Sequence, residues 1–292
     1  MKAPPFAYAR ATSLADVFGL QAETGGRAVL LAGGQTLLAA LAFRLSSPEL
    51  LIDITHVPEL KGVVLTPTGQ VRIGALTTHA ALGAHPLIRA HVPMIAEAVP
   101  QIAHAAVRNR GTIGGSLAYA DAAAELPACC VALDAVIVTT SLTGERRIPA
   151  AQFFTGLFET ALQDRELIAA VEFPMAQAPE RSTVIEFARR AGDYAMAGLA
   201  ARLTHDAGRI TKPRLVLFGV GATPIMAHAT MAVLDGQTAS PALLSAAQAA
   251  LQTDLDPQRD LHGGPDFKRH LARVLLARAI ATLTSIPARQ AA

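Results

Sequence analysis

The pattern of apolar and polar positions near the start of the chain predicts a β-α-β unit. Apolar runs at 28–32 and 50–54 each end at a turn or polar residue, as short buried strands do. The largely apolar stretch 36–45 between them predicts a helix. Ser13 and Asp16 have the spacing of a capping box, so we expect an earlier helix to begin there.

The middle of the chain alternates between short strands and apolar helices. Residues 111–121 are rich in glycine and hydroxyl side chains, and we expect them to form a loop. For the rest, we predict a hairpin of strands at 62–65 and 71–73, buried helices at 93–107 and 122–132, and strands at 135–140 and 166–173.

The second half begins with strands and ends with helices. We predict strands at 183–190, 197–204 and 214–220, followed by helices at 227–234, 241–251 and 267–283. Residues 175–182 are polar and contain a proline, which is typical of a linker. The sequence therefore predicts an α+β protein with domains at 1–175 and 182–288.

Composition excludes several classes of function. Of the 292 residues, 51% are hydrophobic and 16% charged, which favours large cores or interfaces over disorder. A formal net charge of +2 gives no electrostatic reason to expect nucleic acid as a partner. We expect no membrane span and no signal peptide, and hence a cytoplasmic protein. The scattered histidines lack metal-ligand spacing, so we expect no metal site.

The cysteines set a further limit. Cys129 and Cys130 are the only two and lie in an apolar segment, which favours a buried structural role. An iron–sulfur cluster usually needs four thiolates, so this chain is not expected to hold one.

Two glycine-rich stretches are the strongest candidates for ligand binding. Gly33-Gly34 follows a predicted strand and precedes a predicted helix, and Gly111–Ser116 holds three glycines with two hydroxyls. Backbone N–H groups in such turns can bind a diphosphate, and Asp121 could meet a ribose hydroxyl. A tight glycine turn between core elements explains the second stretch about equally well. Neither stretch has the spacing of a Walker loop or a Rossmann fingerprint.

Together the two stretches resemble a known family. The segments AGGQTLLAALAFRLSSPELLIDIT and RNRGTIGGSLAYADAAAELPA are similar to the FAD-binding medium subunit of the molybdenum hydroxylases, as are IGALTTHA, ELIAAVEFP, FARRAGDYAMAGLA and FGVGATP. This group includes the carbon monoxide dehydrogenase medium subunit and the flavin domain of xanthine dehydrogenase. The resemblance implies an FAD-binding domain of two α/β subdomains (PCMH-type) and a C-terminal domain of antiparallel sheet plus helices.

The resemblance also implies which residues contact the cofactor. They are Leu31, Ala32, Gly33, Gly34, Gln35, Thr36, Leu37, Leu38, Ile102, Gly111, Thr112, Ile113, Gly114, Gly115, Ser116, Asp121, Leu167 and Tyr194. FAD would be bound non-covalently, because residues 32–38 and 111–121 contain no His or Cys for attachment. No side chain is expected to act as a catalytic group, because the flavin carries the redox chemistry.

The partners implied are a molybdopterin-binding large subunit and a [2Fe-2S] small subunit in a dimer of heterotrimers. Electrons would pass from the partner chain's clusters through FAD to an external acceptor. Two alternatives stay open, a self-contained FAD-dependent oxidoreductase and an assembly module without nucleotide.

Some residues remain ambiguous at this level. Arg108 and Arg110 suit either phosphate or a carboxylate such as Glu125. His79 follows Thr77-Thr78 and could lie near the glycine stretches, but it is interpreted as a surface or capping histidine. Glu186 stands where many relatives carry a lysine, which would alter the flavin's surroundings.

Overall fold

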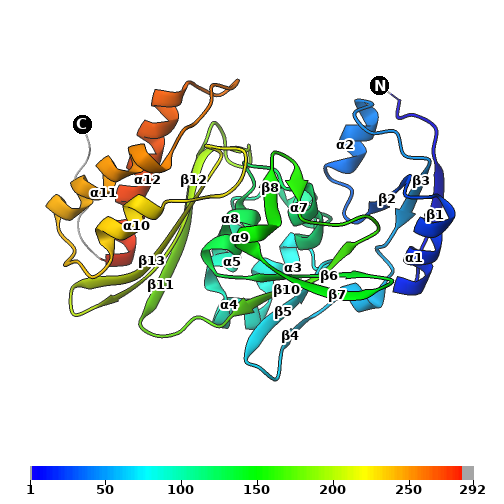
Figure 1. Ribbon diagram of the computed structural model, residues 1–292, viewed down its shortest axis with the longest axis horizontal. Helices are drawn as coiled ribbons and strands as arrows, with labels where there is room; N and C mark the ends of the chain where they lie inside the picture. The colour runs from blue at the N-terminus through cyan, green and yellow to red at the C-terminus, as the bar shows by residue number, and fades with distance from the viewer. Residues whose placement is uncertain (1, 285–292) are drawn as a thin grey trace.

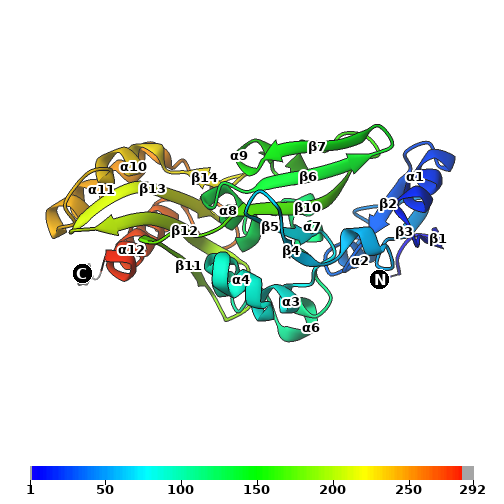
Figure 2. The same ribbon diagram turned by 90° about the horizontal axis from the view of Figure 1, so that it is seen from below.

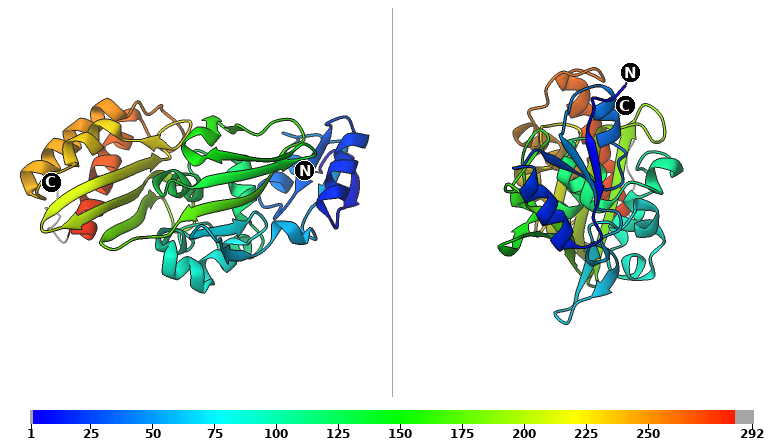
Figure 3. Two further views of the ribbon diagram at one scale, coloured as in Figure 1. Left: turned by 60° about the horizontal axis from the view of Figure 1, so that its bottom comes forward. Right: turned by 90° about the vertical axis from the view of Figure 1, so that its right-hand side faces the viewer.

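Three bodies follow one another along the long axis of the molecule. The structure, a computed structural model, describes residues 2–284. Figure 1 shows the N-terminal body (blue) at one end, a central body (cyan to green) and a C-terminal body (yellow to red) at the other. The end-on view in Figure 3 shows that the molecule is much narrower than it is long. The predicted boundary at residue 288 lies outside the described residues.

The N-terminal body is a small parallel sheet with two helices. Its strands are β1 (Ala7–Arg10), β2 (Ala28–Leu31) and β3 (Leu50–Asp53), and its helices are α1 (Leu14–Glu23) and α2 (Leu37–Ala42). The strand order is β1-β3-β2, so β3 is central and all four of its residues are buried. The predicted β-α-β unit is confirmed, and Ser13 and Asp16 do form a capping box. Sequence analysis did not identify β1.

The central body contains an antiparallel sheet in the order β4-β5-β10-β6-β7. The bounds of these strands are β4 (Val63–Leu65), β5 (Gln70–Gly74), β10 (Leu167–Pro174), β6 (Val136–Ser141) and β7 (Gly144–Pro149). Central strand β10 is buried along all but its last residue, which explains its nearly continuous apolar sequence. The predicted hairpin is confirmed as β4 paired with β5.

Short helices complete the central body. They are α3 (His79–Ala84), α4 (Pro86–His91), α5 (Pro93–Ala98), α6 (Ala105–Arg108), α7 (Ile113–Tyr119), α8 (Glu125–Ala132) and α9 (Ala150–Phe153). Figure 2 shows α3, α4 and α6 together on one side of the sheet. A 3-10 turn η1 (Pro58–Leu60) and the pair β8 (Phe154–Gly156) and β9 (Glu159–Thr160) fill the remaining edges.

Helix α8 joins the central body to the C-terminal one. It contacts strands of the C-terminal sheet as well as α5, and all eight of its residues are buried. Cys129 and Cys130 lie there as free, fully buried thiols, and burial raises the pKa of both.

The C-terminal body is an antiparallel sheet covered on one face by helices. Its strands are β11 (Glu180–Ala188), β12 (Ala195–Asp206), β13 (Arg209–Phe218) and β14 (Ile225–Met226). Its helices are α10 (His228–Leu234), α11 (Pro241–Asp254) and α12 (Pro265–Thr284), which lie on the sheet in Figure 1. The α+β class is therefore confirmed. In residues 2–284 no helix has the length and apolar content needed to cross a membrane.

Two local predictions are wrong. The helix expected over 93–107 is broken into α5 and α6, and Ala103 between them has a φ of +41° that no helix continues through. The loop expected over 111–121 is largely helix α7, which Thr112 caps by accepting a hydrogen bond from the Gly115 N–H at 3.1 Å.

Candidate functional site

A cavity of about 590 Å³ opens where the three bodies meet. Its wall is formed by the end of β2, the first glycine turn, residues 102–107, α7, residues 162–168 and residues 192–194. The predicted site residues on its wall are Ala32, Gly33, Gly34, Gln35, Thr36, Leu37, Ile102, Gly111, Thr112, Gly114, Gly115, Ser116, Asp121, Leu167 and Tyr194. Segments far apart in sequence are thus brought together around one space of a size usual for ligand sites.

Three predicted residues do not line this cavity. Ile113 is fully buried within the core of the central body. Leu38 is 51% exposed on α2. The Leu31 side chain packs beside Gly34, with its Cδ1 3.1 Å from where a Gly34 Cβ would lie.

The first glycine turn presents unbonded backbone donors. Within the described residues, none of the N–H groups of residues 33–36 donates a hydrogen bond, although all four residues line the cavity. Gly34 has a φ of +74°, which favours glycine at this turn. Backbone donors left unpaired beside a cavity are costly unless a ligand or water accepts from them. The turn therefore suits an anionic group such as a diphosphate.

The second glycine stretch is built differently. Its N–H groups at Gly111, Ile113, Gly114, Gly115 and Ser116 all donate within the protein, to Val107 O, Thr77 O, Ala75 O, Thr112 Oγ1 and Thr112 O. Neither Gly114 nor Gly115 has a positive φ. The Gly114 N–H is thus paired with Ala75 O and the Gly115 N–H with the Thr112 hydroxyl, so neither amide is free to bind a phosphate in this structure.

Close backbone contacts explain why glycine occupies positions 33 and 114. A Cβ on Gly33 would lie 2.2 Å from the Arg110 carbonyl oxygen, and one on Gly114 would lie 2.6 Å from the Ala75 Cβ. Both distances are far below any ordinary contact. Only glycine lets the first turn touch the second stretch and lets α7 pack on residue 75.

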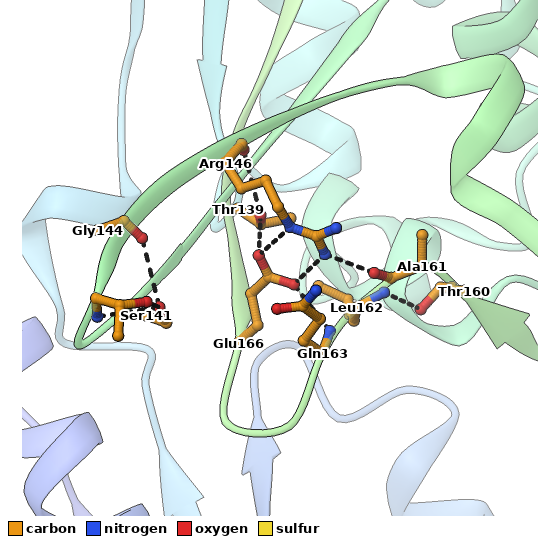
Figure 4. A network of polar contacts seen from close by, with 10 residues as sticks. Thr139, Ser141, Gly144, Arg146, Thr160, Ala161, Leu162, Gln163 and Glu166 are labelled. Carbon is orange, nitrogen blue, oxygen red and sulfur yellow. Dashed lines mark hydrogen bonds and ion pairs between the residues drawn. The ribbon is translucent and has the colours of Figure 1, made fainter.

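The far wall of the cavity is held by an ion pair. Arg146 donates to both carboxylate oxygens of Glu166, at 3.0 and 2.6 Å, and to the Ala161 carbonyl at 2.6 Å (Figure 4). Glu166 also accepts from Gln163 N and from Thr139 Oγ1. Burial raises the pKa of Glu166, but these bonds outweigh it and hold the pKa below its usual value. The network fixes the segment that carries Leu167 to the cavity.

An acidic group lies at the end of the cavity near Tyr194. Glu125 is 8% exposed and lines the cavity, and burial raises the pKa of its carboxyl to about 7, with the nearby Asp121 adding to the effect. Burial and the charge of Glu125 raise the pKa of Glu186 to about 8. One Glu186 carboxylate oxygen has no hydrogen-bond partner in the described residues. Glu125 therefore exchanges its proton close to neutral pH at the cavity wall, and the charge of Glu125 acts on Glu186, which does not line the cavity.

Replacing Glu125 by glutamine should make the stability of the flavin-free protein less dependent on pH. The folded state binds the proton more tightly than the unfolded state, so stability declines as pH rises from about 4.5 to about 7. Glu125→Gln should raise the free energy of unfolding by roughly 1–3 kcal/mol at about pH 8.5 and leave it nearly unchanged at about pH 4. Denaturant melts at both pH values measure this, and equal stability of both proteins at high pH would contradict it.

The structure shows where the two candidate arginines, Arg108 and Arg110, lie relative to the cavity. Arg108 donates to the carbonyls of Ile102 and Ala103, at 2.8 and 2.6 Å, so it holds the turn between α5 and α6, and it does not line the cavity. Arg110 lines a second cavity of about 440 Å³, which shares Gly33 and Thr112 with the first. No lysine or arginine lines the first cavity among the described residues. An anion in this cavity would therefore be bound by neutral donors, among them the unbonded N–H groups of residues 33–36.

Sequence analysis missed several residues of the cavity wall. Among those with polar side chains are His79, His104, Tyr119, Glu125, Glu166 and Asp193. The interpretation of His79 as a surface or capping residue is wrong, since it is 6% exposed. Its position directly after Thr77-Thr78, in a segment already thought to lie near the glycine loops, was the available signal. Within residues 2–284, no cluster of His, Cys, Asp and Glu side chains could hold a metal ion.

The cavity fits FAD on these observations. Its unbonded amides suit the diphosphate, and its apolar residues Ile102 and Leu167 offer surfaces for a ring. Two family profiles match the chain: an FAD-binding domain in molybdopterin dehydrogenase over residues 4–176, and a CO dehydrogenase flavoprotein C-terminal domain over residues 182–283.

Individual relatives agree with the profiles. The chain is 40% identical to the 6-hydroxypseudooxynicotine dehydrogenase complex subunit alpha of Paenarthrobacter nicotinovorans, covering 96% of this chain and 95% of that one. Among solved structures, a carbon monoxide dehydrogenase from Hydrogenophaga pseudoflava matches with a TM-score of 0.93 at 34% identity, covering 98% and 99%. Quinoline 2-oxidoreductase from Pseudomonas putida 86 matches with a TM-score of 0.93 at 35% identity, with the same coverage. The chain belongs to the FAD-binding medium subunits of the molybdenum hydroxylases, a family of oxidoreductases.

Proposed function

We propose that this chain carries electrons from iron–sulfur clusters on a partner chain, through bound FAD, to an external acceptor. The observation that supports this most is the row of unbonded N–H groups at residues 33–36 on the cavity wall. When bound, FAD supplies the redox chemistry, and the protein supplies position and electrostatics. The first glycine turn would hold the diphosphate, the cavity side of the second stretch would lie beside the cofactor, and Ile102, Leu167 and Tyr194 would lie beside the ring.

We further propose a complex with a molybdopterin-binding large subunit and a [2Fe-2S] small subunit, arranged as a dimer of heterotrimers. An exposed apolar surface on and after α2 supports a partner there. Leu38, Phe43 and Leu45 are 51%, 63% and 81% exposed, which is unusual for neighbouring apolar side chains. The division into domains at 1–175 and 182–288 and the cytoplasmic location remain predictions.

The purified chain is expected to bind FAD non-covalently. Acid precipitation should release all of the flavin into the supernatant, because no His or Cys of residues 32–38 or 111–121 is present to hold it covalently. The absorption spectrum of the supernatant measures this. Flavin retained by the precipitated protein would contradict it.

Electron transfer is tested with the whole complex. Substrate added to the three-chain complex should bleach the flavin absorption, and the isolated FAD-loaded chain should show no bleaching with the same substrate. Bleaching by the isolated chain would overturn this proposal in favour of a self-contained oxidoreductase.

A further inference from the structure

The side chain of His79 has no adequate partner inside the protein. It is 6% exposed, and neither ring nitrogen makes a hydrogen bond within the described residues. Burial, together with the charge of Arg108, lowers the pKa of the ring to about 4, and a Thr112 backbone group that is close to the ring but outside hydrogen-bond geometry partly offsets this. The ring is therefore neutral at physiological pH, with one donor nitrogen and one acceptor nitrogen.

The position of His79 is fixed by the framework of the cavity. Its backbone N–H donates to the Gly111 carbonyl at 2.9 Å, and Thr78 before it pairs with Thr112 in an antiparallel bridge. A Cβ on Gly111 would lie 3.0 Å from the ring's Cε1, so the ring packs directly against the second glycine stretch. The side chain lines the cavity at this place.

Buried polar atoms without partners are rare in proteins because each one costs free energy. A diphosphate offers acceptors only, whereas a sugar hydroxyl both donates and accepts. A hydroxyl-bearing chain is therefore the chemistry that can satisfy both nitrogens of a neutral imidazole.

We infer that His79 is a cofactor-binding residue whose ring nitrogens hydrogen-bond the sugar hydroxyls of the flavin dinucleotide. This inference rests on the proposed FAD site. It assigns a polar contact to a segment that lies outside both glycine stretches and pairs with the second one.

Two variants and a matched control test the inference by FAD titration of the flavin-free chain. His79→Leu should weaken FAD binding about fivefold to tenfold, which corresponds to roughly 1–1.4 kcal/mol. His79→Gln keeps a donor and an acceptor and should recover part of that loss. Gln21 also has a buried, unpartnered side-chain oxygen but lies away from the cavity, so Gln21→Met should leave FAD affinity unchanged.

Thermal melting separates binding from folding. Flavin-free His79→Leu should melt no lower than wild type, because it removes unpartnered polar atoms, while its stabilisation by added FAD should shrink. If that variant does not fold, NMR of isotope-labelled histidine in the wild type decides: one buried ring should shift when FAD is added. Wild-type FAD affinity in His79→Leu, or no such shift, would overturn the inference. A wild-type chain that binds no FAD would instead overturn the proposed function.

Discussion

Replacing Gly33 by valine is expected to abolish FAD binding while leaving most of the protein folded. The new Cβ would lie 2.2 Å from the Arg110 carbonyl oxygen and 2.8 Å from Gly111 Cα, so the first turn must move away from the second stretch. That movement displaces the unbonded N–H groups of residues 33–36. We expect FAD affinity to decrease by at least about a hundredfold, or roughly 3 kcal/mol. Fluorescence titration with FAD measures it.

Gly19→Ala is the matched control for this change. Gly19 lies in α1 of the same body, and a Cβ there meets no atom within 4 Å. Alanine should stabilise the helix by roughly 0.5–1 kcal/mol and leave FAD affinity unchanged. A Gly33→Val protein that binds FAD like wild type would show that the first turn does not hold the cofactor.

Replacing Gly114 by alanine should damage the fold, whereas the same change at Gly115 should damage binding. A Gly114 Cβ would lie 2.6 Å from Ala75 Cβ and 2.8 Å from its carbonyl oxygen, which already accepts the Gly114 N–H. Relief requires α7 to separate from residue 75, in the core of the central body. Overpacking of this kind typically costs about 1–3 kcal/mol. Thermal melts of the flavin-free variants should show a clear decrease for Gly114→Ala.

At Gly115 the nearest atom to a new Cβ is Thr112 Oγ1 at 3.0 Å, a contact that a small side-chain shift can relieve. Gly115 also lines the cavity, so the methyl group takes up space there. Gly115→Ala should therefore melt closer to wild type than Gly114→Ala does and bind FAD more weakly. Equal melting temperatures for the two variants would contradict the different roles given to these glycines.

The sequence alone predicts the first glycine turn correctly, because all the residues that determine the turn are neighbours in the chain. A short apolar strand, two glycines and the start of a helix follow one another within residues 28–42, and the structure has β2, the turn and α2 there. The family resemblance depended on the same segment. For this part of the site, pattern and structure agree.

The sequence predicts a loop over 111–121, but most of it is helix α7, because the deciding contacts are distant in sequence. Two adjacent glycines disfavour a helix by intrinsic propensity. Pairing of Ile113 and Gly114 with Thr77 and Ala75 overrides that preference, and the Thr112 cap adds to it. The same pairing decides which backbone N–H groups remain free. No local sequence pattern shows which N–H groups remain free, and none shows that the His79 ring is buried against Gly111.

The broken helix over 93–107 has a related cause. Its apolar composition favours one buried helix, but the chain turns at Ala103, where Arg108 holds the carbonyls of residues 102 and 103. This turn places Ile102 on the cavity wall. The sequence marks Arg108 as a candidate for phosphate or carboxylate binding, but its partners are backbone oxygens, which a sequence pattern does not identify.

Titration of the flavin-free chain with FAD and, separately, with FMN tests most directly the claim that this cavity binds a dinucleotide through the amides of residues 33–36. FAD should bind one molecule per chain, and FMN, which lacks the diphosphate and the adenosine, should bind at least about a hundredfold more weakly, or by roughly 3 kcal/mol. Equal affinity for FMN and FAD, or no binding of FAD, would contradict the account.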